Sequence, residues 1–186
     1  MIIVADSGGS KTDWRLLKKD GSIGQANSSG FNPYYQPIEH LKEITEESLL
    51  PQVKEEVSKI FFYGTGVSSE KNVHSIQKVF SGYFPKASIE VGWDLLAAAR
   101  ALCGREPGIA CILGTGSNSC LYDGEKIIDN VANLGWILAD EGSGTYMGKQ
   151  LIFDYFRKDM PESLAKQFHA RFPWSRPGGS VRSSGR

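Results

Sequence analysis

Residues 2–17 read IIVADSGGSKTDWRLL, two apolar runs separated by an acid, two glycines, hydroxyl side chains and a lysine. The β-branched run Ile2–Ala5 predicts a buried strand, and Thr12–Leu17 predicts a second one. The two glycines would weaken a strand and Asp6 would be costly in a core, so the stretch between the runs breaks local rules. Such departures are typical of functional or strained sites.

The same pattern occurs twice in the chain. After the second run, Asp20-Gly21 predicts a hairpin into a third strand at 22–26. The later copy has predicted strands at 109–113, 118–122 and 126–129, a glycine turn at 114–117 and a second Asp-Gly hairpin at 123–124. An internal duplication of this kind predicts two related lobes.

Strands and helices alternate in the rest of the sequence. We expect further strands at 60–63 and 89–91, and helices at 38–49, 68–80, 95–103, 146–157 and 161–172. This alternation predicts an α/β fold with a mixed sheet in each lobe. The expected organisation is a first lobe over 1–106, an incomplete second lobe over 107–172 and a disordered tail over 173–186.

The composition excludes several classes of protein. The chain has 186 residues, with 21 basic and 21 acidic side chains, so no net field favours nucleic acid or an anionic membrane. Its three cysteines form no CxxC pair, which fits a reducing compartment. No segment is long enough to span a bilayer and none has the pattern of a signal peptide, so we expect a cytoplasmic protein.

The two glycine turns predict phosphate binding. A tight turn between strands can expose several backbone N–H groups, and glycine lets phosphate oxygens approach closely. Asp6 ends the first strand and is placed to hold a hydrated Mg²⁺, which takes few carboxylates and several phosphate oxygens. The alternative is that each turn is only a hairpin. The residues predicted to contact phosphate are Gly8, Gly9, Ser10, Lys11, Thr12, Gly114, Thr115, Gly116 and Ser117.

These residues also carry a resemblance to a known superfamily. The segments 6–12 (DSGGSKT) and 114–118 (GTGSN) resemble the two phosphate motifs shared by actin, the heat-shock ATPases and the sugar kinases. Gly135-Trp136 followed by 140–143 (DEGS) narrows the resemblance to the N-acetylglucosamine kinases and the related BadF/BadG/BcrA/BcrD ATPases. The resemblance implies two duplicated ribonuclease-H-like, or actin-like ATPase, lobes around a cleft that the two turns face.

The resemblance also implies roles for single residues. Asp94, at a predicted helix start, matches the base that accepts the proton of the sugar hydroxyl. The residues implied to contact the sugar are Asn32, Asn118, Gly135, Trp136 and Asp140. The sequence alone leaves simpler interpretations open. Asp94 can cap its helix, Asn32 before a proline can be a turn residue, and Asp140 can complement a helix dipole.

The function expected from this resemblance is ATP-dependent phosphotransfer to a small amino sugar, with Mg²⁺, and with the 6-hydroxyl of N-acetylglucosamine as acceptor. The alternatives are an ATPase that activates a partner reductase and a non-catalytic sugar- or nucleotide-binding module. Members of the family continue well past this length, so we expect a truncated or frame-shifted C-terminus. An unfinished lobe would expose apolar surface that a second copy of the chain could cover in a homodimer.

Overall fold

The computed structural model describes residues 1–173, which divide into two compact units. The first unit comprises residues 1–110 and 120–129, and the second comprises 111–119 together with the chain from residue 130 onward. The tail expected at 173–186 lies outside the described residues, apart from Pro173. The lobe boundary predicted near residue 106 remains a prediction.

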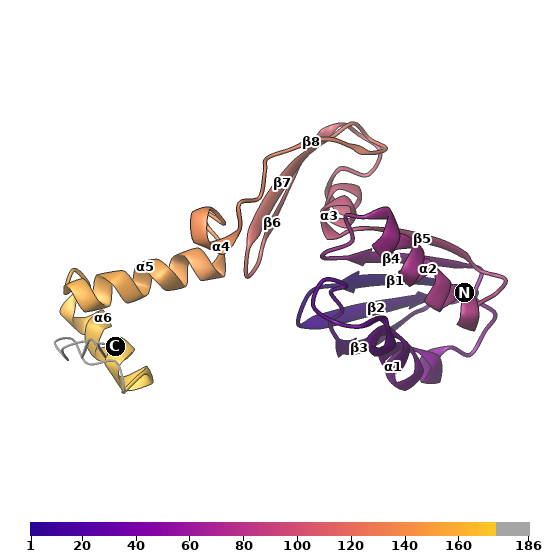
Figure 1. Ribbon diagram of the computed structural model, residues 1–186, viewed down its shortest axis with the longest axis horizontal. Helices are drawn as coiled ribbons and strands as arrows, with labels where there is room; N and C mark the ends of the chain where they lie inside the picture. Colours follow the sequence, from indigo (N-terminus) through magenta and orange to yellow (C-terminus); the bar gives the residue numbers. More distant parts are fainter. Residues whose placement is uncertain (174–186) are drawn as a thin grey trace, which may run out of the picture. The chain divides into compact units, whose positions relative to one another are not determined.

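The first unit is built on a five-stranded mixed sheet with the order β3-β2-β1-β4-β5 (Figure 1). Its strands are β1 (Ile2–Ser7), β2 (Lys11–Leu17), β3 (Ile23–Ser29), β4 (Lys59–Gly64) and β5 (Ser88–Trp93). Its helices are α1 (Ile38–Ile44), α2 (Glu70–Tyr83) and α3 (Asp94–Cys103). β1, β2 and β3 form an antiparallel meander, whereas β4 pairs parallel with both β1 and β5. The predicted strands of this lobe and the helices predicted over 68–80 and 95–103 are therefore confirmed.

The hydrophobic core lies between one face of this sheet and the helices α1 and α2. Alternate residues along each strand point to this face, as the period of a half-buried strand requires. Trp14 from β2 is fully buried there, and its ring meets Phe80 of α2 edge-on at a centroid distance of 6.3 Å. Phe62 of β4 contacts Phe80 at 5.5 Å. The two apolar runs of the opening sequence thus anchor the meander against α2.

The helix predicted over 38–49 has a different form in its second half. α1 ends at Ile44 and continues as a π-helical turn, Thr45–Leu49, followed by a 3₁₀ turn, Leu50–Gln52. The hydroxyl of Thr45 is buried and donates to the carbonyl of Leu41 at 2.7 Å. Such back-bonding bends helices, and the proline at position 51 lacks the N–H that would extend this one.

The opposite face of the sheet carries α3, which is fixed by a polar cluster. The guanidinium of Arg100 donates to the hydroxyl of Tyr63 on β4 at 2.7 Å and to the carboxylate of Glu90 on β5. Burial opposes the charge of Arg100, but these two hydrogen bonds outweigh it and hold the pKa of Arg100 above its ordinary value. A Cβ at Gly92 would lie 3.3 Å from Leu96, so the glycine allows α3 to pack closely on β5.

The second copy of the strand pattern forms a separate three-stranded sheet with the order β6-β7-β8. Its strands are β6 (Gly108–Leu113), β7 (Ser117–Tyr122) and β8 (Ile127–Asn130). Short turns join them, so the sheet is antiparallel, and the prediction of a mixed sheet in the second lobe is wrong for the described residues. In the first sheet the parallel strand β4 pairs with β1; within 1–173, no strand pairs in that way with β6. The predicted strands themselves are confirmed.

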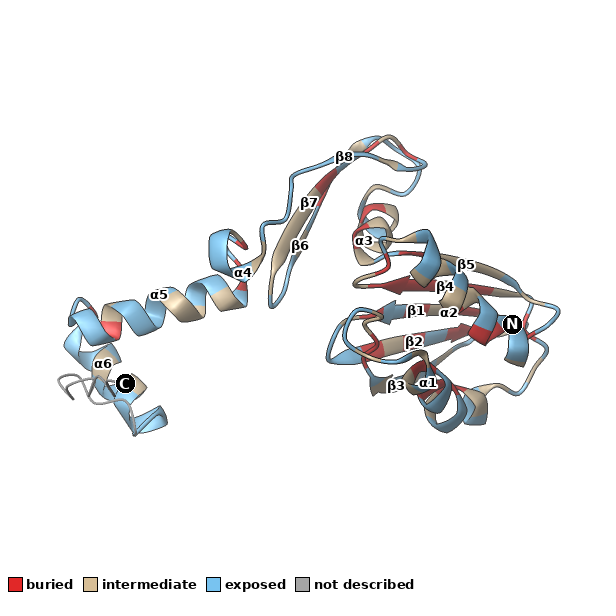
Figure 2. Ribbon diagram, in the orientation of Figure 1, coloured by how far each residue is buried: buried red, intermediate tan, exposed pale blue. Residues whose placement is uncertain are grey.

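The helices of the second unit are α4 (Gly135–Leu138), α5 (Gly144–Arg157) and α6 (Glu162–Arg171). Figure 2 shows that most of α5 and α6 is exposed, in contrast to β1, β2 and β4 of the first sheet, which carry several buried residues each. The contact between α5 and α6 is aromatic, with the rings of Tyr155 and Phe168 at 4.5 Å. The short helix α4 was not predicted from the sequence.

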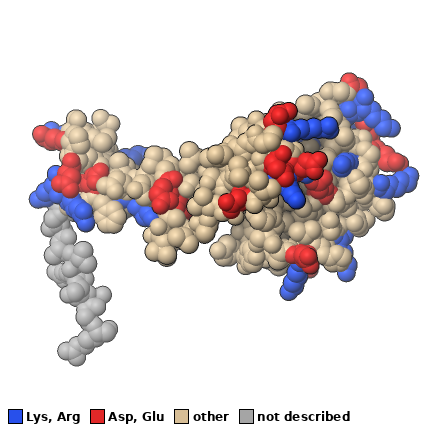
Figure 3. All heavy atoms as spheres, turned by 90° about the horizontal axis from the view of Figure 1, so that it is seen from above, with Lys and Arg blue, Asp and Glu red and all other residues tan. Residues whose placement is uncertain are grey.

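On the face seen in Figure 3, acidic and basic side chains are intermixed. Among the described residues, no helix combines the length and the apolar character needed to cross a membrane.

Candidate active site

Three parallel strands of the first unit end at the same edge of the sheet. β1 ends at Asp6-Ser7, β4 at Gly64 and β5 at Trp93, and the pairing places Ser7 opposite Gly64 and Gly64 opposite Trp93. Ligands of open α/β sheets bind outside the carboxyl ends of the strands. The predicted metal ligand Asp6, on β1, and the predicted base Asp94, directly after β5, therefore lie at one edge of the sheet, with β4 between the two strands.

The first glycine turn joins β1 to β2 at this edge. It is closed by a hydrogen bond from the N–H of Gly8 to the carbonyl of Lys11 at 2.9 Å. Gly9 and Ser10 are exposed at its tip, as a phosphate-binding turn requires. A Cβ at Gly9 would meet no atom within 4 Å, so the turn is open on its outer side.

Below the turn lies a glycine that sequence reasoning did not select. A Cβ at Gly30 would lie 2.2 Å from the carbonyl oxygen of Gly8 and 2.7 Å from the nitrogen of Lys11. Because both atoms belong to the backbone, only glycine fits without moving the turn. The only sequence signal was the position of Gly30 at the end of the third strand, beside the predicted Asn32.

Three buried groups support the turn from inside. The hydroxyls of Ser7 and Thr12 lie 2.8 Å apart, and the N–H of Phe31 donates to the Ser7 oxygen at 3.2 Å. The Thr12 side chain is only 1 % exposed, so its hydroxyl bonds inside the protein and its contribution to the site is to hold the turn. This buried network accounts for a hydroxyl side chain at position 7.

Lys11 lies on the outer side of the turn. Its ammonium forms an ion pair with Asp13 at 2.8 Å, and both side chains contact solvent. The hydrogen bond to Asp13 raises the pKa of Lys11, and the same bond lowers the pKa of Asp13. Water screens an exposed pair of this kind, so the lysine can exchange this partner for a phosphate at little cost.

Asp94 is the first residue of α3 and is half-buried. Its Oδ1 accepts from the N–H of Leu95 at 2.8 Å, while Trp93 occupies the N-cap position and no side chain caps the helix. Asp94 thus follows the N-cap residue, and its carboxylate accepts one backbone N–H of the first turn of α3, which is part of the role that the simpler interpretation expected. Burial raises the pKa of Asp94, and the negative charge of Asp6 raises it further against the opposing bond from Leu95. A carboxylate with a raised pKa at a binding edge is a candidate general base.

Asn32 lies in the loop after β3, close to the loop after β4. Its Oδ1 accepts from the N–H of Tyr34 at 3.0 Å, which is the Asx turn that the simpler interpretation expected. A Cβ at Gly66 would lie 2.4 Å from the same oxygen. Asn32 is thus placed beside the carboxyl end of β4, and its contact with a sugar remains a prediction.

The second glycine turn, in the second unit, is held by the acidic loop that follows it in the sequence. Asp140 is buried, has a positive φ of 63°, and accepts from the N–H of Ser117 at 3.1 Å through Oδ1. The N–H groups of Gly144 and Thr145, at the start of α5, donate to the carbonyls of Gly114 and Thr115 at 2.9 and 3.2 Å. The loop and the turn therefore form one structural element, which sequence reasoning did not foresee.

The predicted sugar-contacting residues of this unit lie in two places. Asn118 and Asp140 both line a hollow of about 300 Å³, together with Cys111, Asn133 and Glu141. Gly135 and Trp136 belong to α4 and do not line it, and the Trp136 ring is 60 % exposed. The structure thus brings Asn118 and Asp140 together, and the sugar contacts of all four residues remain predictions.

A magnesium ion fits the chemistry of Asp6 as one ligand among phosphate oxygens. Among residues 1–173 no three His, Cys, Asp or Glu side chains gather into a metal-binding group. Mg²⁺ in phosphoryl-transfer sites is commonly held by one or two carboxylates, substrate phosphates and water. A single carboxylate at the end of β1 matches that requirement.

Comparison with known proteins identifies the fold. No family model matches the chain, and no curated protein matches it. Among solved structures, two described as putative N-acetylglucosamine kinases are similar. The protein from Porphyromonas gingivalis is 40% identical with a TM-score of 0.85, over 93% of this chain and 62% of that one. The protein from Chromobacterium violaceum is 22% identical with a TM-score of 0.68, over 91% and 63%.

A non-polymerising mutant of MamK bound to AMPPNP is also similar, with a TM-score of 0.56 at 14% identity over 92% of this chain and 64% of that one. The fold is that of the actin-like ATPases. The chain spans less than two thirds of the length of each of these three structures. The expected α/β class with actin-like ATPase architecture is confirmed.

Proposed function

We propose that the chain is part of an ATP-dependent kinase that phosphorylates an amino sugar, with N-acetylglucosamine as the expected acceptor. The observation that carries the proposal is that the half-buried Asp94 lies at the same edge of an actin-like sheet as Asp6 and the first glycine turn. The 40% identity to the Porphyromonas gingivalis protein supports the amino sugar as the substrate class.

In the proposed phosphoryl transfer, Asp6 and the two glycine turns bind the nucleotide. Bound MgATP supplies the phosphoryl group and a metal that neutralises its charge. Asp6 holds the metal, and the backbone of Gly8, Gly9 and Ser10 contacts phosphate oxygens. The second turn, Gly114–Ser117, is the other proposed contact to phosphate oxygens.

Asp94 takes the proton of the sugar hydroxyl as that oxygen bonds to the γ-phosphorus. The bond from phosphorus to the oxygen of ADP breaks, and ADP leaves with that electron pair. The pKa of Asp94 is raised and so lies closer to neutral pH than that of an ordinary aspartate. A general base is most effective when its pKa is near the working pH. The proposed contacts to the sugar are Asn32, Asn118, Gly135, Trp136 and Asp140.

The proposal is tested by ADP release with MgATP across glucosamine, N-acetylglucosamine, N-acetylmuramic acid and glucose. We expect release that depends on the sugar and is fastest with N-acetylglucosamine. Release at the same rate without sugar would identify an ATPase instead, and binding of sugar without release would identify a binding module. The assay is run in parallel on a version of the chain extended to the length of the similar structures.

A further inference from the structure

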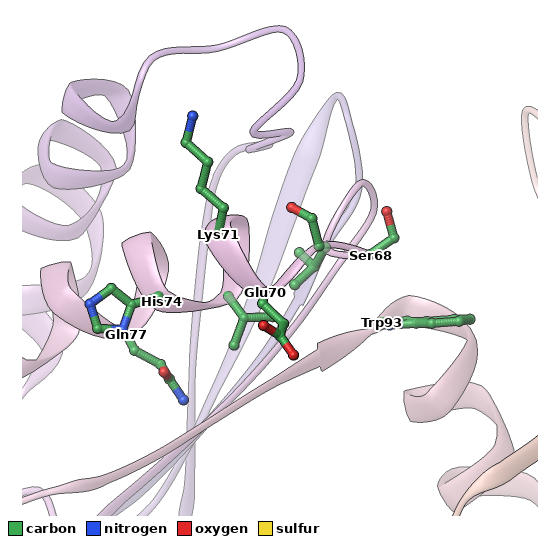
Figure 4. Close-up of a pocket in the computed structure, with 9 residues that line it drawn as sticks. Ser68, Glu70, Lys71, His74, Gln77 and Trp93 are labelled. Atoms are coloured by element: carbon green, nitrogen blue, oxygen red, sulfur yellow. The ribbon is translucent and has the colours of Figure 1, made fainter.

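The first unit contains a hollow that neither the metal, the phosphate turn nor the base occupies. It has a volume of about 610 Å³ and lies between the start of α2 and the end of β5. In Figure 4, Glu70 at the start of α2 lies between Trp93 and the side chains of His74 and Gln77 further along the helix, and Ser68 lies in the turn that precedes the helix. The volume is within the range of small-molecule sites.

Trp93 lines this hollow and is partly exposed. Its side chain is 41 % exposed, whereas Trp14 in the same unit is fully buried. An exposed indole offers a large flat apolar surface with one polar atom, and such rings are enriched at binding sites. The ring at this hollow is therefore a platform on which a flat ligand can stack.

The helix side of the hollow presents polar groups at regular spacing. Glu70, His74 and Gln77 occur at intervals of four and three residues, so they share one face of α2. Carboxylate, imidazole and amide groups together accept and donate hydrogen bonds, as the hydroxyls of a sugar do. An aromatic platform opposite such groups matches a saccharide ring better than an apolar or a highly charged ligand.

The hollow and the base lie on opposite sides of the end of β5. Ile89 and Val91 pack against the core on the α1–α2 face, and by alternation Trp93 points to that same face. Ala5 is in the same core, so Asp6 points to the α3 face, and its charge acts on Asp94. A ligand that contacts both Asp94 and Trp93 must pass around the end of this edge strand and must extend beyond a single sugar ring.

We propose that this hollow is a second saccharide subsite, so that the preferred acceptor is an oligosaccharide of amino sugars. One ring is phosphorylated at Asp94 and the next ring stacks on Trp93 against Glu70, His74 and Gln77. This inference rests on the proposed function, because it assumes that the first ring lies at Asp94.

The test compares N-acetylglucosamine with its β-1,4-linked disaccharide, by titration calorimetry and by ADP release. We expect the chain to bind the disaccharide at least tenfold more tightly than the monosaccharide. Trp93→Ala should remove most of this preference and leave affinity for the monosaccharide within about threefold. His74→Ala should reduce the preference in the same direction. Two controls, Tyr35→Ala and Ser81→Ala, change exposed side chains of the same unit outside the hollow and should keep the preference.

The other outcomes test the subsite and the proposed kinase separately. Equal affinities for the two sugars, or a preference that survives both Trp93→Ala and His74→Ala, would overturn the subsite while a monosaccharide kinase stands. A disaccharide preference that depends on Trp93 but comes without ADP release would support the subsite and contradict the kinase. Absence of binding to either sugar would overturn both.

Discussion

The replacement Gly30→Ala tests whether the first phosphate turn packs directly against Gly30 in the loop after β3. The added Cβ would lie 2.2 Å from the carbonyl oxygen of Gly8, more than an ångström closer than ordinary van der Waals contact. It would also lie 2.7 Å from the carbon of Gly9 and from the nitrogen of Lys11. All three atoms are backbone, so no side-chain rotation relieves the clash and the turn itself must shift.

Overpacking of this kind costs about 2–3 kcal/mol. With a urea m-value of about 2 kcal/mol per M, the midpoint of unfolding should fall by about 1–1.5 M. Tryptophan fluorescence can follow the transition, because Trp14 is fully buried in this unit. The matched control is Gly9→Ala in the same turn, where a Cβ meets no atom within 4 Å. Equal urea midpoints of unfolding for Gly30→Ala and Gly9→Ala would refute the close packing of the turn against Gly30.

Three further predictions concern the polar groups around the two turns. Tyr63→Phe removes a hydrogen bond that fixes α3 through Arg100, so stability should fall by about 1 kcal/mol in urea unfolding; no loss would argue against this anchor. The raised pKa of Asp94 means that its charge destabilises the fold above that pKa and that protonation removes the penalty. Asp94→Asn should therefore be more stable than wild type at pH 7, with a gain that shrinks as the pH falls toward 4; a less stable variant at pH 7 would contradict this. Asp140→Ala leaves the N–H of Ser117 without its carboxylate, so hydrogen exchange of that amide should accelerate at least tenfold, and unchanged protection would show that the loop does not hold the turn.

The elements of the fold were largely predictable because local signals mark them. β-branched runs, two Asp-Gly hairpins and the glycine turns locate the strands of both sheets, and Ser69 caps α2 as a serine before an acid predicts. The π-helical turn after Ile44 depends on a buried hydroxyl, and α4 is too short for periodicity to reveal it. Within residues 1–173 no strand pairs parallel with β6, and the sequence pattern likewise predicts no strand after 126–129.

The sequence predicted which residues belong to the candidate site, but not which other residues they contact. Asp6, Asp94 and the turn glycines are visible in the sequence because they interrupt apolar patterns. The dependence of the first turn on Gly30, and of the second on Asp140, joins residues about twenty positions apart. Such contacts follow from the path of the chain in space. The buried bond between Thr12 and Ser7 likewise needed the register of β1 against β2.

The central claim is that Asp94 accepts the proton during phosphoryl transfer to an amino sugar. The direct measurement is the rate of sugar phosphate formation from MgATP and N-acetylglucosamine, followed by phosphorus NMR, for wild type and Asp94→Asn. Because general bases contribute about 10²–10⁴-fold, we expect kcat to fall at least a hundredfold while KM changes little. The control Asp129→Asn, an exposed carboxylate on β8, should match wild type. Turnover of Asp94→Asn within a few fold of wild type would contradict the account.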